Sequence, residues 1–145
     1  MNSLIHDRDE MDACTSAVIS TLKGRPNATV IGLSGPLGAG KTAFVQSIAR
    51  NLAVLEHVTS PTFVIARFYD IPQHQHFRQL VHIDAYRIES TDELRPLRFE
   101  ELCADSKNLV FIEWPEKLCD SFPKDALRLY IDSVDATTRR IYDKK

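Results

Sequence analysis

One octapeptide restricts the possible fold of this chain more than any other segment: Gly35-Pro36-Leu37-Gly38-Ala39-Gly40-Lys41-Thr42. It matches G-x-x-x-x-G-K-[ST], the pattern of the phosphate-binding loop, or P-loop. Glycine has no Cβ atom, so this backbone can turn tightly and direct several N–H groups toward one anion. A P-loop lies between a strand and a helix, and the octapeptide therefore predicts an α/β fold.

The segments on either side of the octapeptide fit this prediction. Residues 28–33 form a short apolar run that is typical of a strand buried on both faces of a parallel sheet. From residue 41 to about residue 55, apolar side chains recur at helical spacing. Lys41 is expected to contact the β- and γ-phosphates of a nucleotide, and Thr42 to bind magnesium through its hydroxyl. The residues expected to bind the nucleotide here are Gly35, Leu37, Gly38, Ala39, Gly40, Lys41 and Thr42.

Length and composition predict one domain over residues 1–145, because 43% hydrophobic residues are enough for one buried core. The net charge is −2, whereas a protein that binds nucleic acid by itself is usually basic. We therefore expect this chain to contact a polyanion only through another protein. Three cysteines without a C-x-x-C pair predict free thiols. The N-terminal segment resembles no signal peptide and no run is long enough for a membrane span, so we expect a cytoplasmic protein with neither membrane nor DNA as a partner.

The rest of the chain predicts a three-layer, P-loop NTPase-like α/β fold whose sheet is mostly parallel, with an antiparallel hairpin and helices on both faces. The His74-x-His76 pair in the connection between the hairpin strands is interpreted as a solvated loop, since no further ligand lies nearby. The expected elements are a helix over 9–23, hairpin strands at 63–69 and 79–83, a short helix with Ser90 and Glu93 as its capping box, a helical turn over 98–103, a buried strand over 109–112, and strands over 127–131 and 139–142.

Two carboxylates follow apolar runs and are the candidate acids for phosphoryl transfer. Asp84 comes after the run 81–83 and Glu113 after the run 109–112. In open α/β sheets, ligands bind outside the carboxyl ends of the strands, where both side chains would lie. Asp84 suits a magnesium contact, and Glu113 has the reach to align an attacking water. The structural alternatives are a helix or turn cap for Asp84 and an ion pair with a nearby arginine for Glu113.

Three further positions have two interpretations each. Ser60 and Thr62 could belong to a segment that closes over the γ-phosphate, or to an ordinary turn built by Pro61. Trp114 could stack on a base or ribose, or pack in the core. Arg87 could bind a phosphate or form a surface ion pair.

The order and spacing of four motifs resemble the TsaE (YjeE) family, the P-loop ATPase of bacterial tRNA threonylcarbamoyladenosine biosynthesis. The resemblance implies a small ATPase that works with TsaB and TsaD, which transfer a threonylcarbamoyl group to N6 of the adenosine at position 37 of tRNAs reading ANN codons. ATP hydrolysis would reset that complex between turnovers, and tRNA would be reached only through it. The four motifs are Leu37-Gly38-Ala39-Gly40-Lys41-Thr42, Ser60-Pro61-Thr62-Phe63, His82-Ile83-Asp84-Ala85-Tyr86-Arg87 and Ile112-Glu113-Trp114-Pro115-Glu116.

The resemblance also implies roles for single residues. Lys41 and Glu113 would be catalytic; Lys41 and Thr42 would bind phosphate and Mg²⁺ of an ATP complex, Asp84 would be the acidic residue of the magnesium site, Trp114 would lie close to the nucleotide, and Thr62 would belong to a switch-like segment. The chain departs from the family pattern at Pro36, where an acidic residue is usual, at Ala43, where a second threonine is common, and at Arg98, where glycine is usual. Neither Pro36 nor Ala43 removes a phosphate ligand.

Two other functions remain open from the sequence. A small P-loop kinase would transfer phosphate to a substrate hydroxyl, but the chain has no arginine-rich lid segment to close over an acceptor. A nucleotide-gated binding module would use ATP to change its affinity for partners and would hydrolyse it only incidentally. A GTPase is disfavoured, because no N-K-x-D tetrapeptide occurs in the chain.

Overall fold

In the computed structural model, which describes residues 1–61 and 65–144, seven strands form one mixed sheet in the order β1-β7-β6-β2-β5-β4-β3. The strands are β1 (Asn2–Ile5), β2 (Thr29–Ser34), β3 (Ala66–Asp70), β4 (Gln79–Asp84), β5 (Asn108–Glu113), β6 (Leu127–Ser133) and β7 (Arg139–Asp143). The helices are α1 (Arg8–Thr21), α2 (Lys41–Asn51) and α3 (Phe99–Ala104), with two 3₁₀ segments, η1 (Thr91–Leu97) and η2 (Pro115–Ser121).

The centre of the sheet is parallel and its two edges are antiparallel. β6, β2, β5 and β4 run in one direction, whereas β3 pairs antiparallel with β4, and β7 pairs antiparallel with both β6 and β1. All six residues of β2 and of β5 are buried, as expected for central strands covered on both faces. In this register Glu113 pairs with Leu33 on one side and with Asp84 on the other, so three carboxyl ends meet at one edge.

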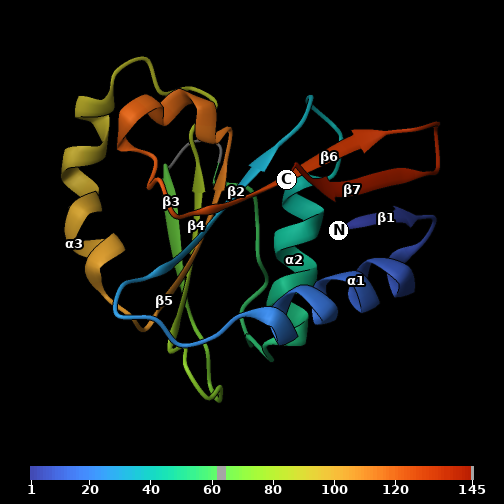
Figure 1. The fold of residues 1–145 in the computed structure, drawn as a ribbon, viewed down its shortest axis with the longest axis horizontal. Coiled ribbons are helices and arrows are strands. Elements are labelled where there is room, and N and C mark those ends of the chain that lie inside the picture. The colour runs from blue at the N-terminus through green and yellow to red at the C-terminus, as the bar shows by residue number, and fades with distance from the viewer. Residues whose placement is uncertain (62–64, 145) are drawn as a thin grey trace.

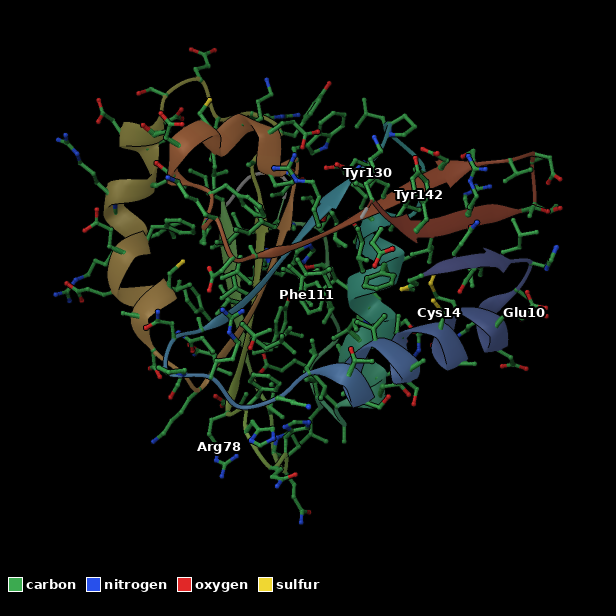
Figure 2. The ribbon with its side chains drawn as sticks, viewed as in Figure 1. Glu10, Cys14, Arg78, Phe111, Tyr130 and Tyr142 are labelled. Atoms are coloured by element: carbon green, nitrogen blue, oxygen red, sulfur yellow. The ribbon has the colours of Figure 1, made fainter. Side chains whose placement is uncertain are left out.

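Helical layers cover the two faces of the sheet, which confirms the expected three-layer architecture (Figure 1). One apolar cluster joins α1 and α2 to the sheet and includes Phe44 and Phe111, whose ring centroids are 6.1 Å apart. Phe111 is labelled near the centre of the molecule in Figure 2. The second cluster lies between the sheet and the η1, α3 and η2 layer, and contains Leu94, Phe99 and Leu118.

Most of the expected elements are present. The first helix, the β3–β4 hairpin, the capping box and the β6–β7 pair are all confirmed, and the Tyr130 and Tyr142 rings stack across that pair with centroids 5.4 Å apart (Figure 2). The helix after the P-loop was expected to reach residue 55 but ends at Asn51, because Ala53 adopts a left-handed conformation with φ 57°. Residues 62–64, at the expected start of the hairpin, lie outside the described residues, and so does the switch-like Thr62.

Two elements were not expected from the sequence. β1 has four residues, too few to show an alternating pattern, and it forms because it pairs with β7 at the far end of the chain. The amino group of Met1 also contacts Asp143 Oδ1 at 2.7 Å, next to that pairing. η2 follows Glu113 directly and begins at Pro115, whose fixed φ suits the first position of a helix.

A polar network joins α1 to α2, the helix that begins at the P-loop. Asp12 Oδ1 accepts hydrogen bonds of 2.5 Å from both Ser47 Oγ and Arg50 Nη2. The Ser47 hydroxyl also lies 2.6 Å from that of Thr15, and both of these residues are fully buried. The bonds from Arg50 and Ser47 hold the pKa of Asp12 below its usual value. The charge of Asp12 therefore contributes to the contact between the two helices.

We expect Asp12→Ala to lower the free energy of unfolding at pH 7 by about 2 kcal/mol, the usual scale for hydrogen bonds to a charged group. Because the folded-state pKa of Asp12 is lowered, its contribution is complete above the unfolded pKa of about 3.9 and is lost as the pH falls through the folded pKa. Urea unfolding at pH 7 and at pH 3 should therefore show a smaller difference from wild type in acid. Asp9→Ala, an exposed acid in the first turn of the same helix, is the control and should cost less than about 1 kcal/mol.

Arg98 links η1 to α3 in a left-handed conformation, with φ 52° and ψ 52°. It is the position where the sequence resemblance predicts glycine, and a side chain there is strained. We expect Arg98→Gly to raise the free energy of unfolding by roughly 1 kcal/mol, since its exposed ion pair with Glu101 contributes less than the strain. Arg95→Gly, within η1, should instead destabilise the protein in the same urea titration; a lower midpoint for Arg98→Gly would contradict the strain argument.

Candidate active site

The P-loop connects β2 to α2 along a path that only glycine allows at two points. A Cβ atom on Gly35 would lie 2.2 Å from the backbone oxygen of Ile131 in β6. Gly40 caps α2 with φ 107°, a conformation that other residues rarely adopt. The expected phosphate loop therefore adopts the strand–loop–helix arrangement that its sequence pattern requires.

Lys41 lies within the loop that it is expected to serve. Its Nζ donates hydrogen bonds to the carbonyl oxygens of Gly35 at 2.7 Å and Pro36 at 2.9 Å, and lies 4.5 Å from the centre of the Trp114 ring. Burial lowers the pKa of Lys41, and the nearby charge of Glu113 opposes that shift. Pro36, a departure from the family pattern, thus contributes its carbonyl to holding the lysine.

The two candidate acids lie side by side at the carboxyl ends of β4 and β5. Asp84 and Glu113 are register partners, and Glu113 is only 4% exposed. The hydroxyl of Thr42, in the first turn of α2, lies 3.0 Å from Glu113 Oε2. Asp84 Oδ1 accepts the backbone N–H of Tyr86 at 3.0 Å. Burial raises the pKa of Asp84, and the neighbouring charge of Glu113 adds to the shift.

A cavity of about 400 Å³ brings most of the expected site residues together. Of the expected phosphate-binding residues, Gly35 and Ala39 do not line it, because Gly35 lies against β6 and Ala39 is fully buried. Trp114 lines it with its ring 5.0 Å from that of Tyr86, and Ser60 also reaches it. The lining residues are Leu37, Gly38, Gly40, Lys41, Thr42, Ala43, Ser60, Asp84, Tyr86, Arg87, Glu113 and Trp114.

The comparisons with known proteins concern the family of the chain. A family model described as "Threonylcarbamoyl adenosine biosynthesis protein TsaE" matches residues 5–141. The chain belongs to the TsaE family. A TsaE protein from Streptomyces coelicolor is 41% identical over 110 residues, which are 75% of this chain and 72% of that protein. Another from Borreliella burgdorferi is 35% identical over 102 residues, or 70% and 71% of the two chains.

The fold is also that of a solved structure. Bacillus subtilis YdiB superposes with a TM-score of 0.73 at 23% sequence identity, covering 97% of this chain and 82% of that one. Both relatives of the TsaE family named above are called tRNA threonylcarbamoyladenosine biosynthesis proteins. The resemblance that four short motifs suggested is thereby confirmed at the level of the family.

His82 is a site residue that the sequence alone did not single out. Its Nε2 lies 2.6 Å from Glu113 Oε2, and its side chain is fully buried. The signal was present in the strand: Leu80, His82 and Asp84 occupy alternate positions, so they share one face of β4. A polar residue at such an inward position, two residues before a candidate acid, indicates a contact with the site.

A second cavity, of about 570 Å³, lies beside the first and shares Gly38, Gly40 and Ala43 with it. Its other walls come from the start of α1, from α2 and the segment after it, and from the turn between β6 and β7. Asp7, which caps α1, and Arg139 of β7 both line it. These residues are far apart in the sequence, so no local pattern could have predicted the cavity.

The donor atoms around the P-loop suit magnesium. Across residues 1–61 and 65–144, no three His, Cys, Asp or Glu side chains converge on one point. Thr42 and Asp84 nonetheless supply hard oxygen donors in one cavity, and Mg²⁺ commonly combines one or two such protein ligands with substrate phosphates and water.

Elsewhere in the chain, His74 Nδ1 accepts the backbone N–H of His76 at 3.0 Å, which fits a turn. All three cysteines are free thiols, as expected. No helix in the described part of the chain combines the length and the apolar character needed to cross a membrane.

Proposed function

We propose that this chain is the ATP-binding and ATP-hydrolysing subunit of the machinery that makes tRNA N6-threonylcarbamoyladenosine. The observation that supports the proposal most directly is the meeting of the P-loop residues Lys41 and Thr42 with the buried Glu113 in one cavity. A binding site alone needs the loop and its lysine. Hydrolysis also requires a group that orients a water for in-line attack, and the buried carboxylate next to the threonine hydroxyl can do this.

Each residue has a separate task in this proposal. The loop amides and Lys41 would bind the phosphates, and Thr42 and Asp84 would hold Mg²⁺, which would supply positive charge to neutralise the phosphate oxygens. Glu113 accepts a hydrogen bond from the attacking water and aligns it. Trp114 packs beside Lys41 and restricts the room around the phosphates.

One nucleotide would extend across both cavities. They share Gly38, Gly40 and Ala43, so phosphates in the cavity of about 400 Å³ would place the ribose and base toward the cavity of about 570 Å³. ATP is the proposed nucleotide because the chain belongs to the TsaE family. Ser60 lines the first cavity, and Thr62, outside the described residues, would belong to the segment that covers the γ-phosphate.

The proposed partners are the TsaB and TsaD type subunits of the threonylcarbamoyl transferase, whose complex the hydrolysis would reset between turnovers. The names of the relatives support this assignment, and the net charge of −2 supports indirect contact with tRNA through the complex. The protein would act in the cytoplasm as one ATPase domain spanning residues 1–145, with neither membrane nor DNA as a partner.

An ATPase assay of the purified chain, alone and with TsaB–TsaD and tRNA, tests the proposal. We expect magnesium-dependent release of free phosphate that rises when the partners are added. The absence of stimulation would contradict the proposed place in the complex. Phosphate transferred to an added acceptor, instead of released, would indicate the kinase alternative.

A non-hydrolysable ATP analogue separates hydrolytic resetting from nucleotide gating. If hydrolysis resets the complex, the analogue should support a single burst of tRNA modification and no further turnover. Full multiple turnover with the analogue would instead identify a nucleotide-gated binding module.

A further inference from the structure

A buried histidine lies directly behind the acid that the proposed ATPase would use. His82 is 0% exposed, Glu113 is 4% exposed, and His82 Nε2 lies 2.6 Å from Glu113 Oε2. An ionised carboxylate can only accept hydrogen bonds, so Nε2 would be the donor of this bond when Glu113 is ionised. We propose that His82 is a positioning residue that fixes the orientation of the Glu113 carboxylate for hydrolysis, an inference that rests on the proposed function.

The two oxygens of Glu113 have different surroundings. Oε2 receives both the His82 bond of 2.6 Å and the Thr42 bond of 3.0 Å, whereas the hydrogen bond found for Oε1 among residues 1–61 and 65–144 is a longer one of 3.3 Å from Thr42 Oγ1. Two donors from two different elements, β4 and α2, thus anchor one oxygen. Oε1 is left as the oxygen that can accept a water, while the Thr42 hydroxyl keeps its lone pairs for a cation.

Packing alone does not explain a histidine at this position. Leu80 precedes it on the same face of β4 and belongs to the apolar core, and Phe111 is its register partner on β5. Moreover, His82 Nδ1 is buried and has no hydrogen-bond partner within the described residues. A buried polar atom without a partner destabilises the fold, and an apolar residue would avoid that cost. The bond to Glu113 is the feature that distinguishes histidine from leucine or phenylalanine here.

Two substitutions at this position separate positioning from folding. We expect His82→Phe to lower kcat by about 10–100-fold, the usual effect of losing a residue that orients a functional group. KM for ATP and the Kd of a fluorescent ADP analogue should change less than about twofold, because the P-loop is untouched. His82→Gln should recover most of kcat, since the amide nitrogen of glutamine can donate from about the place of Nε2.

Phe111→Leu is the matched control. Phe111 pairs with His82 across the two strands and packs against Phe44. Its phenyl ring has no N–H or O–H group that could donate a hydrogen bond to Glu113. Its substitution should lower the melting temperature and leave kcat within about twofold of wild type, because it changes packing without removing a hydrogen-bond donor from Glu113. If kcat falls only because the protein is less stable, it should fall in both His82→Phe and Phe111→Leu.

The coupling between His82 and Glu113 is the decisive measurement. In single-turnover assays, His82→Phe should reduce the rate in wild type but add no further loss in a Glu113→Gln background. Proton NMR of the wild-type protein should also show a downfield, slowly exchanging Nε2–H signal that His82→Phe removes. An equal loss in both backgrounds, no recovery in His82→Gln, an unchanged kcat in His82→Phe, or no such NMR signal would each overturn the inference. A wild-type protein without turnover in the presence of the partners would instead overturn the proposed function.

Discussion

Glu113→Ala should bind ATP as tightly as wild type, within about threefold, but lose about 10²–10⁴-fold in turnover, the usual range for removal of a general base. Binding and turnover should be affected differently because of where Glu113 lies. Glu113 lies at the end of β5, behind the Thr42 hydroxyl, whereas the phosphates would be held by the loop amides and Lys41. Calorimetric titration with a slowly hydrolysed analogue measures binding, and phosphate release with the partners present measures turnover.

A carboxylate at the other end of the strands, away from the P-loop, provides the control for this experiment. Asp70 is exposed at the end of β3, opposite Gln79, and the strand pair places it away from Asp84 and Glu113. Asp70→Ala should leave both binding and turnover unchanged. If Glu113→Ala hydrolysed ATP at the wild-type rate with the partners present, the catalytic assignment of Glu113 would be wrong.

Lys41→Ala should abolish measurable nucleotide binding, with a loss of roughly 100-fold or more in affinity, because hydrogen bonds to charged groups contribute about 1.5–3 kcal/mol each. The ammonium is pre-positioned: two loop carbonyls hold it in a site where only 5% of the residue is exposed. A phosphate arriving there would meet a positive charge with little water to screen it. Titration with a fluorescent ATP analogue measures the affinity.

Lys107→Ala is the corresponding control, since Lys107 immediately precedes β5 at the edge of the sheet away from the P-loop. It removes the same charge from the protein and should leave the affinity within about twofold, because exposed charges at this distance are screened by salt. Circular dichroism should show that Lys41→Ala remains folded. Wild-type affinity in Lys41→Ala would exclude the P-loop as the nucleotide site.

Local sequence patterns predicted much of the candidate site because its parts lie at the ends of short, recognisable elements. The P-loop has a pattern of its own, and the acids Asp84 and Glu113 each follow an apolar run. The rule that ligands bind at the carboxyl ends of parallel strands then places both acids near the loop. The register of β4 against β5 agrees, since these two residues are direct partners.

Other parts could not be predicted because they depend on contacts between distant segments. β1 exists through its pairing with β7, and the cavity of about 570 Å³ is bounded by residues from both ends of the chain. The surroundings of Trp114 also depended on the fold: it takes φ 59°, and its ring lies 5.0 Å from the Tyr86 ring and 4.5 Å from Lys41 Nζ. The sequence offered base stacking or core packing and had no means to choose.

The sequence by itself therefore determined the loop that can bind phosphate, the two acids and the family to which the chain belongs, because each depends on residues that are adjacent or at fixed short spacing. Only the tertiary structure decided how the Glu113 carboxylate is held. His82 and Thr42 reach it from a neighbouring strand and from the helix after the loop, and Oε2 accepts from both. Hydrogen bonds between separate elements depend on register and packing, which no single stretch of sequence specifies.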